Sequence, residues 1–363
     1  QWPTWCLILL GSLCAAICII HVYRPHIHMP AMRSETFRRF QWQYLLVYLM
    51  VMIVDWTQVI SKREVYSKYK EMSIFRQKMA NLPKRFRGNS TSVVGVWTNE
   101  SEFNMYSIGY MSAAVFSLLG GEYIDSVGRK KSCILYCILE IMVNILAHFS
   151  DTTILLIGHI LSGMSTTLLF TAFQSWMIHE HRRLGFHERL LKYTFSLVQI
   201  TSAVAAIIAC MATFLLTEQY GKTGPFRMSV LLSVAVAIYV YVYWVENCGY
   251  SSMKIIPAAR TIFRDRPLAW LCIVQAFVES TSYVWAFFCA EALDTKYKKI
   301  VLASFMLSKL IGGYIFQILV VGKRVSGRRL GVPALFLASI SLAIVAHSDQ
   351  NFTTTIVGFL IFQ

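Results

Sequence analysis

The stretch "GGEYIDSVGRKK", from Gly120 to Lys131, separates two apolar segments of the chain. Ala, Val, Phe, Leu and Ser dominate the preceding residues, Tyr106 to Leu119, and the sequence becomes apolar again at Cys133. Lysine and arginine in short loops are retained on the cytoplasmic side of a membrane. A short turn that ends in three consecutive basic residues therefore predicts a cytoplasmic loop joining two membrane helices.

The composition also indicates that a membrane is the solvent of this chain. Of its 363 residues, 56% are hydrophobic and only 15% are charged, unlike a soluble globular protein. The formal net charge is +15, but the basic residues lie between apolar segments and form no continuous face, so we expect no nucleic-acid partner. All of the nine cysteines except Cys248 fall inside apolar runs, which predicts small buried side chains and neither a disulfide framework nor a metal site.

Repeated apolar runs are long enough to cross a bilayer as helices. A crossing helix needs about 20 mostly apolar residues, because its backbone polar groups must be satisfied within the segment. Such runs are predicted at 5–22, 42–60, 106–124, 132–149, 153–177, 193–216, 228–245, 268–290, 300–321 and 330–346, with another beginning at 352–363. A signal peptide is the alternative for the first run, but its start lacks a basic segment, so we favour a retained helix. The chain ends inside an apolar run, so we expect it to be incomplete at the C-terminus.

Alternate short loops differ in their content of basic residues. Loops such as 129–131 and 182–192 are rich in Arg and Lys and are predicted inside, which places the N-terminus outside. Segment 61–104 is also basic, yet it is predicted outside, because long loops carry less weight in this rule. It is predicted to be a long outer insertion, and a gene-model error is the alternative. Sequons at Asn89, Asn99 and Asn351 all fall in loops predicted outside and are candidate glycosylation sites; chance sequons without a glycan are the alternative.

The opening stretch contains the pattern Gly121-x-x-x-Asp125-x-x-Gly128-Arg129-Lys130. Small residues let helices approach closely, and an acid near a helix end can accept hydrogen bonds from the N-terminus of another helix. The pattern resembles the loop signature of the major facilitator superfamily. This resemblance implies that Asp125 and Arg129 form a latch between two helical halves, closed in one orientation and open in the other. Ser126 stands where the family usually has a basic residue, so we expect a weaker latch. A plain cytoplasmic loop with an incidental acid is the alternative.

Four further stretches carry a closer resemblance: "FRRFQWQYLLVYLMVMIVDWTQ" (37–58), "GHILSGMSTTLLFTAFQSWMIHEH" (158–181), "VEN" (245–247) and "QAFVES" (275–280). Together they resemble the molybdate-anion transporter family of the major facilitator superfamily. The resemblance implies uptake of molybdate, a tetrahedral dianion, at the plasma membrane, without a cofactor. Where the family typically has an arginine and a glutamate, this chain has His159 and Gln174, so the resemblance supplies no fixed positive charge for an anion at His159.

Charged residues inside the predicted spans are candidates for the substrate and proton pathway. A charge at the bilayer centre costs about 2.5 to 3.5 kcal/mol, so each such residue needs a partner or water. With the polar residues that the resemblance adds, the candidates are Asp55, Gln58, Glu140, His159, Gln174, Glu279 and Lys309.

Helix depth groups these candidates into pairs. At about 1.5 Å per residue, Glu279 and Lys309 reach similar depths on consecutive antiparallel helices, which predicts an ion pair or a shared proton or anion. Two unrelated structural residues are the alternative. Asp55 and His159 are both predicted in the outer third of the membrane, where a protonated His159 would attract an oxyanion and Asp55 would handle the proton. A satisfied buried histidine is the alternative there.

We therefore predict an all-α, polytopic membrane protein with the major facilitator fold of two pseudo-symmetric helical halves. Its predicted parts are an extra helix and linker (1–40), an N-terminal half (41–245) with the insertion 61–104, a central cytoplasmic loop (246–267) and a truncated C-terminal half (268–363). The predicted function is secondary-active uptake of molybdate or a related oxyanion by alternating access. The lipid bilayer is a further partner, and protons are a candidate one.

Two other functions stay open from the sequence. A carrier of another small organic solute is favoured by the missing arginine, and a non-transporting receptor or scaffold with a transporter fold is the second alternative. An enzyme is not expected, because the sequence shows no nucleophile-base arrangement and no phosphate-binding glycine loop.

Overall fold

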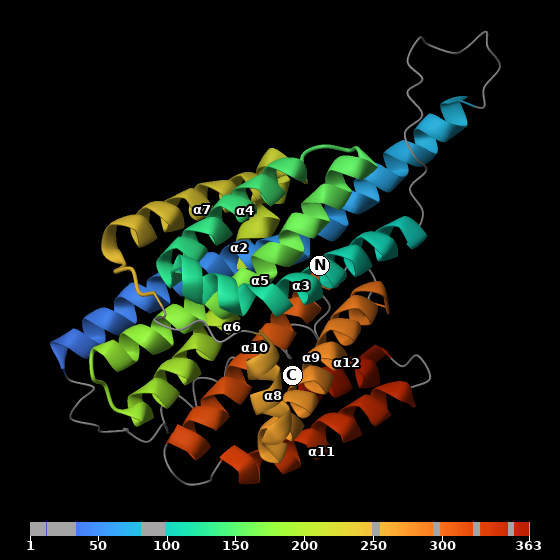
Figure 1. Cartoon of the computed structure of the whole chain (residues 1–363). Helices are drawn as coiled ribbons and strands as arrows, with labels where there is room; N and C mark the ends of the chain where they lie inside the picture. Colours follow the sequence, from blue (N-terminus) through green and yellow to red (C-terminus); the bar gives the residue numbers. More distant parts are fainter. Residues whose placement is uncertain are drawn as a thin grey trace. The chain divides into compact units, whose positions relative to one another are not determined.

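A computed structural model describes residues 34–80, 99–248, 255–292, 298–321, 327–347 and 352–362, together with Ser12. All regular structure in these residues is helical, which confirms the predicted all-α class. The helices are α2 (Glu35–Ala80), α3 (Asn99–Val127), α4 (Arg129–Leu146), α5 (Thr152–Arg183), α6 (Glu188–Tyr220), α7 (Gly224–Tyr243), α8 (Ile255–Arg264), α9 (Arg266–Ala292), α10 (Lys298–Phe316) with the π-turn η3 (Gln317–Val321), α11 (Gly327–Ala346) and α12 (Phe352–Phe362) (Figure 1).

Each predicted span from 42–60 onward falls on one of these helices. Among the described residues, five stretches have the length and apolar composition needed to cross a membrane: 35–62 in α2, all of α5, α6 and α7, and 329–346 in α11. Glycine, serine and tyrosine dilute the apolar content of α3, whereas α4 carries several charges. The predicted first span, 5–22, lies outside the described residues apart from Ser12.

The segment 61–104 differs from the sequence expectation, because much of it is helical. Helix α2 is 46 residues long and continues to Ala80, and α3 already begins at Asn99. The stretch 61–80 contains no proline or glycine and is rich in Lys, Glu, Arg, Met and Gln, which are good helix formers. Polarity suggested a loop, but helix propensity predicts the observed structure better.

A short helix also occupies the predicted central loop 246–267. In α8 the apolar residues Ile255 and Ile256 recur two turns later as Ile262 and Phe263, and Arg260 and Arg264 lie before and after the second pair. This spacing gives an amphipathic helix. A ten-residue helix is too short to register in a search for membrane spans, which is why the sequence analysis missed it.

Contacts divide the chain into two compact units. Unit 1 comprises 1–45, 186–207 and 256–363, and unit 2 comprises 46–185 and 208–255. The candidate residues Asp55 to Gln174 belong to unit 2, whereas Glu279 and Lys309 belong to unit 1. The predicted division into parts at residues 40, 245 and 267 stays a prediction.

Helix α5 is the centre of unit 2, because it packs against both α3 and α4, and α4 packs in turn against α7 (Figure 1). Gly163 makes the close contact with α3 possible: a Cβ atom there would lie 2.3 Å from the backbone oxygen of Gly109. Interhelical hydrogen bonds add to this contact, from Ser112 Oγ to the Ile160 oxygen at 2.9 Å and from Thr167 Oγ1 to the Ala113 oxygen at 3.1 Å. Small residues thus bring α3 and α5 together, as in many membrane helix pairs.

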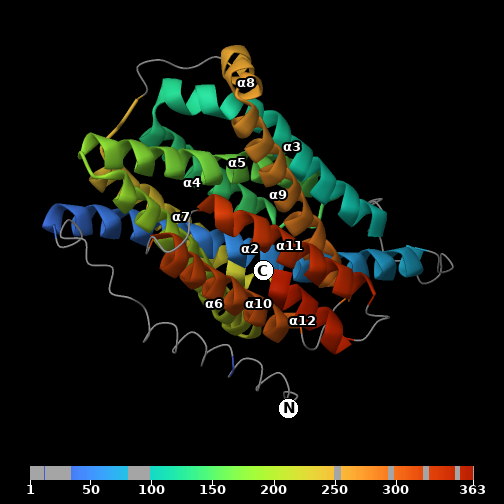
Figure 2. The same ribbon diagram turned by 90° about the horizontal axis from the view of Figure 1, so that it is seen from below.

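In unit 1, α12 packs against both α10 and α11 (Figure 2). A Cβ atom on Gly358 would lie 2.5 Å from Val345 Cγ2, and Ser308 Oγ donates a hydrogen bond of 3.0 Å to the backbone oxygen of Leu360. Close packing at a small residue therefore holds this unit together as well.

Candidate functional site

Glu140 is the most enclosed of the predicted charged residues. It lies in the middle of α4 and is only 5% exposed. Gln58 Nε2 from α2 donates to one carboxylate oxygen and Ser165 Oγ from α5 donates to the other. Asn144, one turn along α4, donates from Nδ2 to the Glu140 backbone oxygen at 2.7 Å and to the carboxylate at 3.4 Å. Three helices thus converge on one carboxyl group.

The groups around Glu140 suit an ionised carboxylate. An ionised glutamate only accepts hydrogen bonds, and its three side-chain partners, Gln58, Asn144 and Ser165, all donate. A buried charge of this kind is tolerated where hydrogen bonds and an opposite charge compensate for lost hydration. The opposite charge is available, because Lys62 lies within electrostatic range of Glu140.

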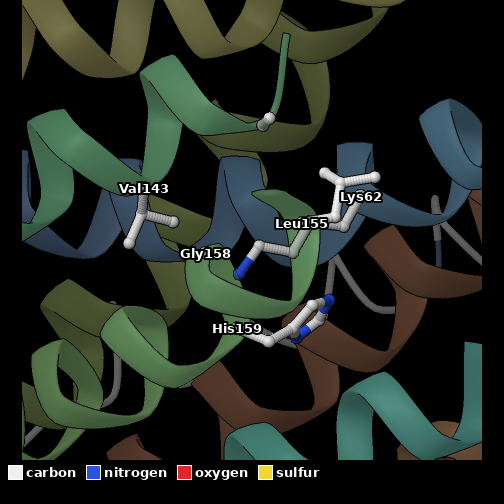
Figure 3. Close-up of a pocket in the computed structure, with 6 residues that line it drawn as sticks. Lys62, Val143, Leu155, Gly158 and His159 are labelled. Atoms are coloured by element: carbon white, nitrogen blue, oxygen red, sulfur yellow. The ribbon is translucent and has the colours of Figure 1, made fainter. Parts of the chain in front are cut away.

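Lys62 comes from α2 and was not among the residues singled out in the sequence. Its Nζ donates a hydrogen bond of 2.9 Å to Ser162 Oγ on α5. Glu140 and Asp55 both lie within electrostatic range of the Lys62 amino group. Lys62 and His159 line a small cavity, whose other walls are Val143, Ala147, Leu155 and Gly158. Figure 3 shows Lys62, Val143 and His159 entering it from α2, α4 and α5. The cavity volume is about 10 Å³, which is room for about one water molecule.

His159 is buried, at 5% exposure, in the contact between α5 and α3. Its ring meets the edge of Tyr106 with 5.3 Å between centroids, and the absence of a side chain at Gly109 leaves space for it. His159 and Lys62 line the same cavity and lie within electrostatic range of each other. A basic side chain, Lys62, therefore lies on the same cavity as His159, the position where the resemblance expected an arginine.

One helical face of α2 carries three residues of this site. Asp55, Gln58 and Lys62 are spaced three and four residues apart, so they lie above one another on the helix surface. Asp55 is half-buried and lies within electrostatic range of Tyr48, Tyr110 and Tyr136, on α2, α3 and α4. This spacing would have identified Lys62 from the sequence if the predicted helix had continued past residue 60.

Three predicted residues are not among those described so far. Gln174 is half-buried further along α5. In unit 1, Glu279 is exposed on α9 and its Oε1 accepts a hydrogen bond of 2.8 Å from Gln275, and Lys309 is half-buried on α10. The predicted pairing of Glu279 with Lys309 stays a prediction.

The turn between α3 and α4 is held by an acid that the sequence analysis did not single out. Gly128 has a φ of 112°, and a Cβ atom there would lie 2.6 Å from Glu246 Oε1. Glu246 follows α7 and accepts hydrogen bonds from the backbone N–H groups of Lys130 at 3.0 Å and Lys131 at 3.3 Å. A carboxylate at a helix N-terminus is favourable because of the free N–H groups and the helix dipole. Its place in "VEN", a stretch quoted for the family resemblance, was the available signal.

Asp125 and Arg129, the predicted latch residues, form an ion pair with each other. Arg129 Nη2 lies 2.7 Å from Asp125 Oδ1. The Nε and Nη1 atoms of Arg129 are buried and have no hydrogen-bond partner within the described residues. Lys130 Nζ donates to the Tyr241 oxygen at 2.8 Å, and Gly121 faces open space. The role of this turn as a latch stays a prediction.

Of the candidate glycosylation sites, Asn99 alone lies within the described residues. Asn89 and Asn351 lie outside the described residues, and Asn99 is the first residue of α3. Glycosylation at these asparagines stays a prediction.

Comparison with known proteins adds family information to this geometry. Residues 94–357 match a family described as sugar transporters with 12 transmembrane segments. The molybdate-anion transporter of Xenopus laevis is 24% identical over 355 residues, covering 94% of this chain and 72% of the relative. The nucleoside transporter NupG has a TM-score of 0.63 at 10% identity, covering 89% of this chain and 79% of that one. The human organic anion transporter MFSD10 (TETRAN) has a TM-score of 0.59 at 13% identity, covering 91% of this chain and 83% of that one.

Proposed function

Because this chain belongs to the MFS_5 family of the major facilitator superfamily and is a membrane transporter by fold, we propose that it carries molybdate or a related oxyanion into the cell by alternating access. The predicted superfamily and the predicted resemblance to molybdate-anion transporters are confirmed by the family match and by the relative from Xenopus laevis. Substrate, direction and mechanism are the proposal.

The observation that carries the proposal is the cavity between Lys62 and His159. Two nitrogen-bearing side chains line one small cavity, and the lysine donates a hydrogen bond to Ser162. A tetrahedral oxyanion offers only acceptors, so ammonium, imidazole N–H and hydroxyl donors are the groups that would recognise it. Because the cavity has room for about one water molecule, the anion enters only when the surrounding helices separate. Separation of packed helices around a central site is what alternating access provides.

The same reasoning gives the setting of the transporter. We propose that it works in the plasma membrane, needs no cofactor and is not an enzyme, since the family and the similar folds are transporters. Asp55, Gln58, Glu140, His159 and Gln174 belong to the proposed substrate and proton pathway of unit 2.

A second candidate is transport of a small organic solute. It is favoured by the charges at the site, where Asp55 and Glu140 stand against the single cation Lys62. Such a site suits a neutral or partly cationic solute, and the matching family is described as sugar transporters.

Uptake of radiolabelled molybdate into cells that express the full-length protein tests these two functions. We expect saturable uptake that sulfate inhibits and sugars do not, and an Asp125→Asn variant should slow it without changing the order of inhibitors. No uptake despite normal surface expression would contradict the proposal and favour a scaffold role. Inhibition by sugars or organic solutes, but not by sulfate, would favour the second candidate.

A further inference from the structure

We propose that Lys62 and Glu140 form a coupling pair, in which the substrate anion binds to Lys62 and Glu140 takes up a proton in the same step. This inference rests on the proposed function and assigns its binding and coupling residues. Lys62 is the cationic group that replaces the missing arginine, and Glu140 is the group whose charge Lys62 balances before the anion arrives.

The two side chains are connected through both of their neighbouring helices. On α2, Gln58 donates to Glu140 and lies one turn before Lys62. On α5, Ser162 accepts from Lys62 at 2.9 Å, and Ser165, three residues on, donates to Glu140. Residues three or four apart share a helix face. The binding group Lys62 and the proton acceptor Glu140 are therefore connected through the same two helices, α2 and α5.

The balance of charge requires a proton when an anion binds. The buried site holds two carboxyl groups, Asp55 and Glu140, and one ammonium group, Lys62. A dianion that engages Lys62 removes the counter-charge of Glu140 and brings further negative charge into the same low-dielectric space. Protonation of the Glu140 carboxylate removes one negative charge: a hydronium ion from the solution on the side of anion entry loses one O–H bond and becomes water, and the carboxylate gains an O–H bond. On release of the anion, the proton leaves and the Lys62–Glu140 balance is restored.

Other titratable groups surround the pair on each helix that packs against it. They are Asp55 from α2, Tyr136 and Cys137 from α4, and His159 from α5. Of these, Asp55 and His159 also lie within electrostatic range of Lys62. Three donors from three helices converge on Glu140, so movement of these helices changes its surroundings.

The surroundings of Lys62 suit a residue that exchanges its hydrogen bond to Ser162 for contacts with the incoming anion. The present cavity, with room for about one water molecule, is lined by the lysine, which donates a hydrogen bond to Ser162. Opening of α2 from α5 would break this single hydrogen bond. The flexible lysine stem then presents all three ammonium donors to the incoming oxyanion.

Transport in proteoliposomes tests the binding half of the proposal. Purified full-length protein would be assayed for molybdate uptake under an inward proton gradient. Lys62→Ala should raise KM roughly 10- to 100-fold, the factor typical for loss of a hydrogen bond to a charged group, and Lys62→Arg should recover most of that loss. Lys222→Ala, in the turn between α6 and α7, is the matched control and should leave KM unchanged. An unchanged KM in Lys62→Ala would overturn the assignment.

The coupling half has a different readout. Glu140→Gln should lose gradient-driven net uptake, yet keep exchange of internal for external molybdate at equal pH on both sides, and its exchange rate should no longer depend on pH. Net uptake that still follows the proton gradient in this variant would overturn the role of Glu140.

A measurement on the unaltered protein covers the case in which Glu140→Gln does not fold. Molybdate added to purified protein in weak buffer should cause uptake of about one proton for each anion bound, reported by a pH dye. Anion binding without proton uptake would contradict the coupling pair. If the unaltered protein neither binds nor transports molybdate, the proposed function fails, which is distinct from the outcomes that overturn Lys62 or Glu140.

Discussion

Glu140 and Glu279 are the same residue type in the middle of apolar helices, but the protein holds them in different ways. Glu140 is buried, and its donors Gln58 and Ser165 lie 82 and 25 positions away in the sequence, on other helices. Glu279 is exposed, and its donor Gln275 lies four positions away on the same helix. A carboxyl group held by other helices responds when those helices move, whereas one held by its own helix moves with it. Glu140 is thus the better placed for coupling.

The largest effect should come from removing the two carboxyl groups in turn. Glu140→Ala removes one of the two carboxyl groups that balance the charge of Lys62 and leaves Gln58 and Ser165 without their acceptor, so we expect a loss of about 3–5 kcal/mol in the free energy of unfolding. Glu279→Ala should leave stability unchanged or raise it, because one local hydrogen bond is lost and an apolar side chain suits lipid better. Unfolding in detergent micelles measures both. Equal losses would remove the distinction between the two sites.

The donors should repeat the contrast on a smaller scale. Gln58→Ala removes an interhelical hydrogen bond to a charged group, which is worth about 1.5–3 kcal/mol. Gln275→Ala removes a hydrogen bond between residues one turn apart on an exposed helix face, worth about 0.2–0.5 kcal/mol. The same unfolding assay compares them, and a larger loss for Gln275→Ala would reverse the ranking.

Helix spacing at Gly163 tests whether packing positions the donors of Glu140. Gly163→Ala places a Cβ atom against the Gly109 backbone, so α3 and α5 must separate, at about 1–3 kcal/mol. We expect molybdate uptake to fall as well, since Gly163 lies between Ser162 and Ser165. Gly331→Ala in α11 is the control, because its Cβ atom would meet nothing within 4 Å. Normal uptake by Gly163→Ala would show that the site tolerates a wider spacing.

Glu246 offers a third kind of glutamate and the smallest expected effect. Its carboxylate receives backbone N–H groups at the start of α4, so Glu246→Gln keeps the shape and removes only the charge. Loss of a charge–dipole interaction at a helix end should cost about 0.3–1 kcal/mol. Glu122→Gln, half-buried on α3, is the control, and unfolding at low ionic strength is the measurement. A loss as large as that for Glu140→Ala would mean that the turn is a second buried charge site.

The sequence predicted what depends on local pattern. Apolar runs located the helices, and the need for a partner identified Glu140, whose partners the sequence could not name because they come from α2 and α5. Lys62 was missed for a different reason: the polar composition after residue 60 indicated a loop, although propensity favoured helix up to Ala80.

The turn at Gly128 shows the same limit from the other side. The short separation of Asp125 and Arg129 in the sequence made their ion pair foreseeable, although the two residues lie on different helices, α3 and α4, on either side of Gly128. The contribution of Glu246 depends on how the end of α7 meets the start of α4, more than a hundred residues earlier in the chain. Nothing in the local pattern of either segment encodes that meeting.

Helix α2 is continuous from Glu35 to Ala80, and at 1.5 Å per residue it measures roughly 69 Å. The hydrocarbon core of a bilayer is only about 30 Å thick, so a stiff shaft projects well past the lipid. Gln58 and Lys62 both lie on this helix, so a tilt of its projecting end would move both residues. An antibody fragment that tilted the projecting end would reposition both residues without touching either, and could therefore inhibit the carrier from a distance.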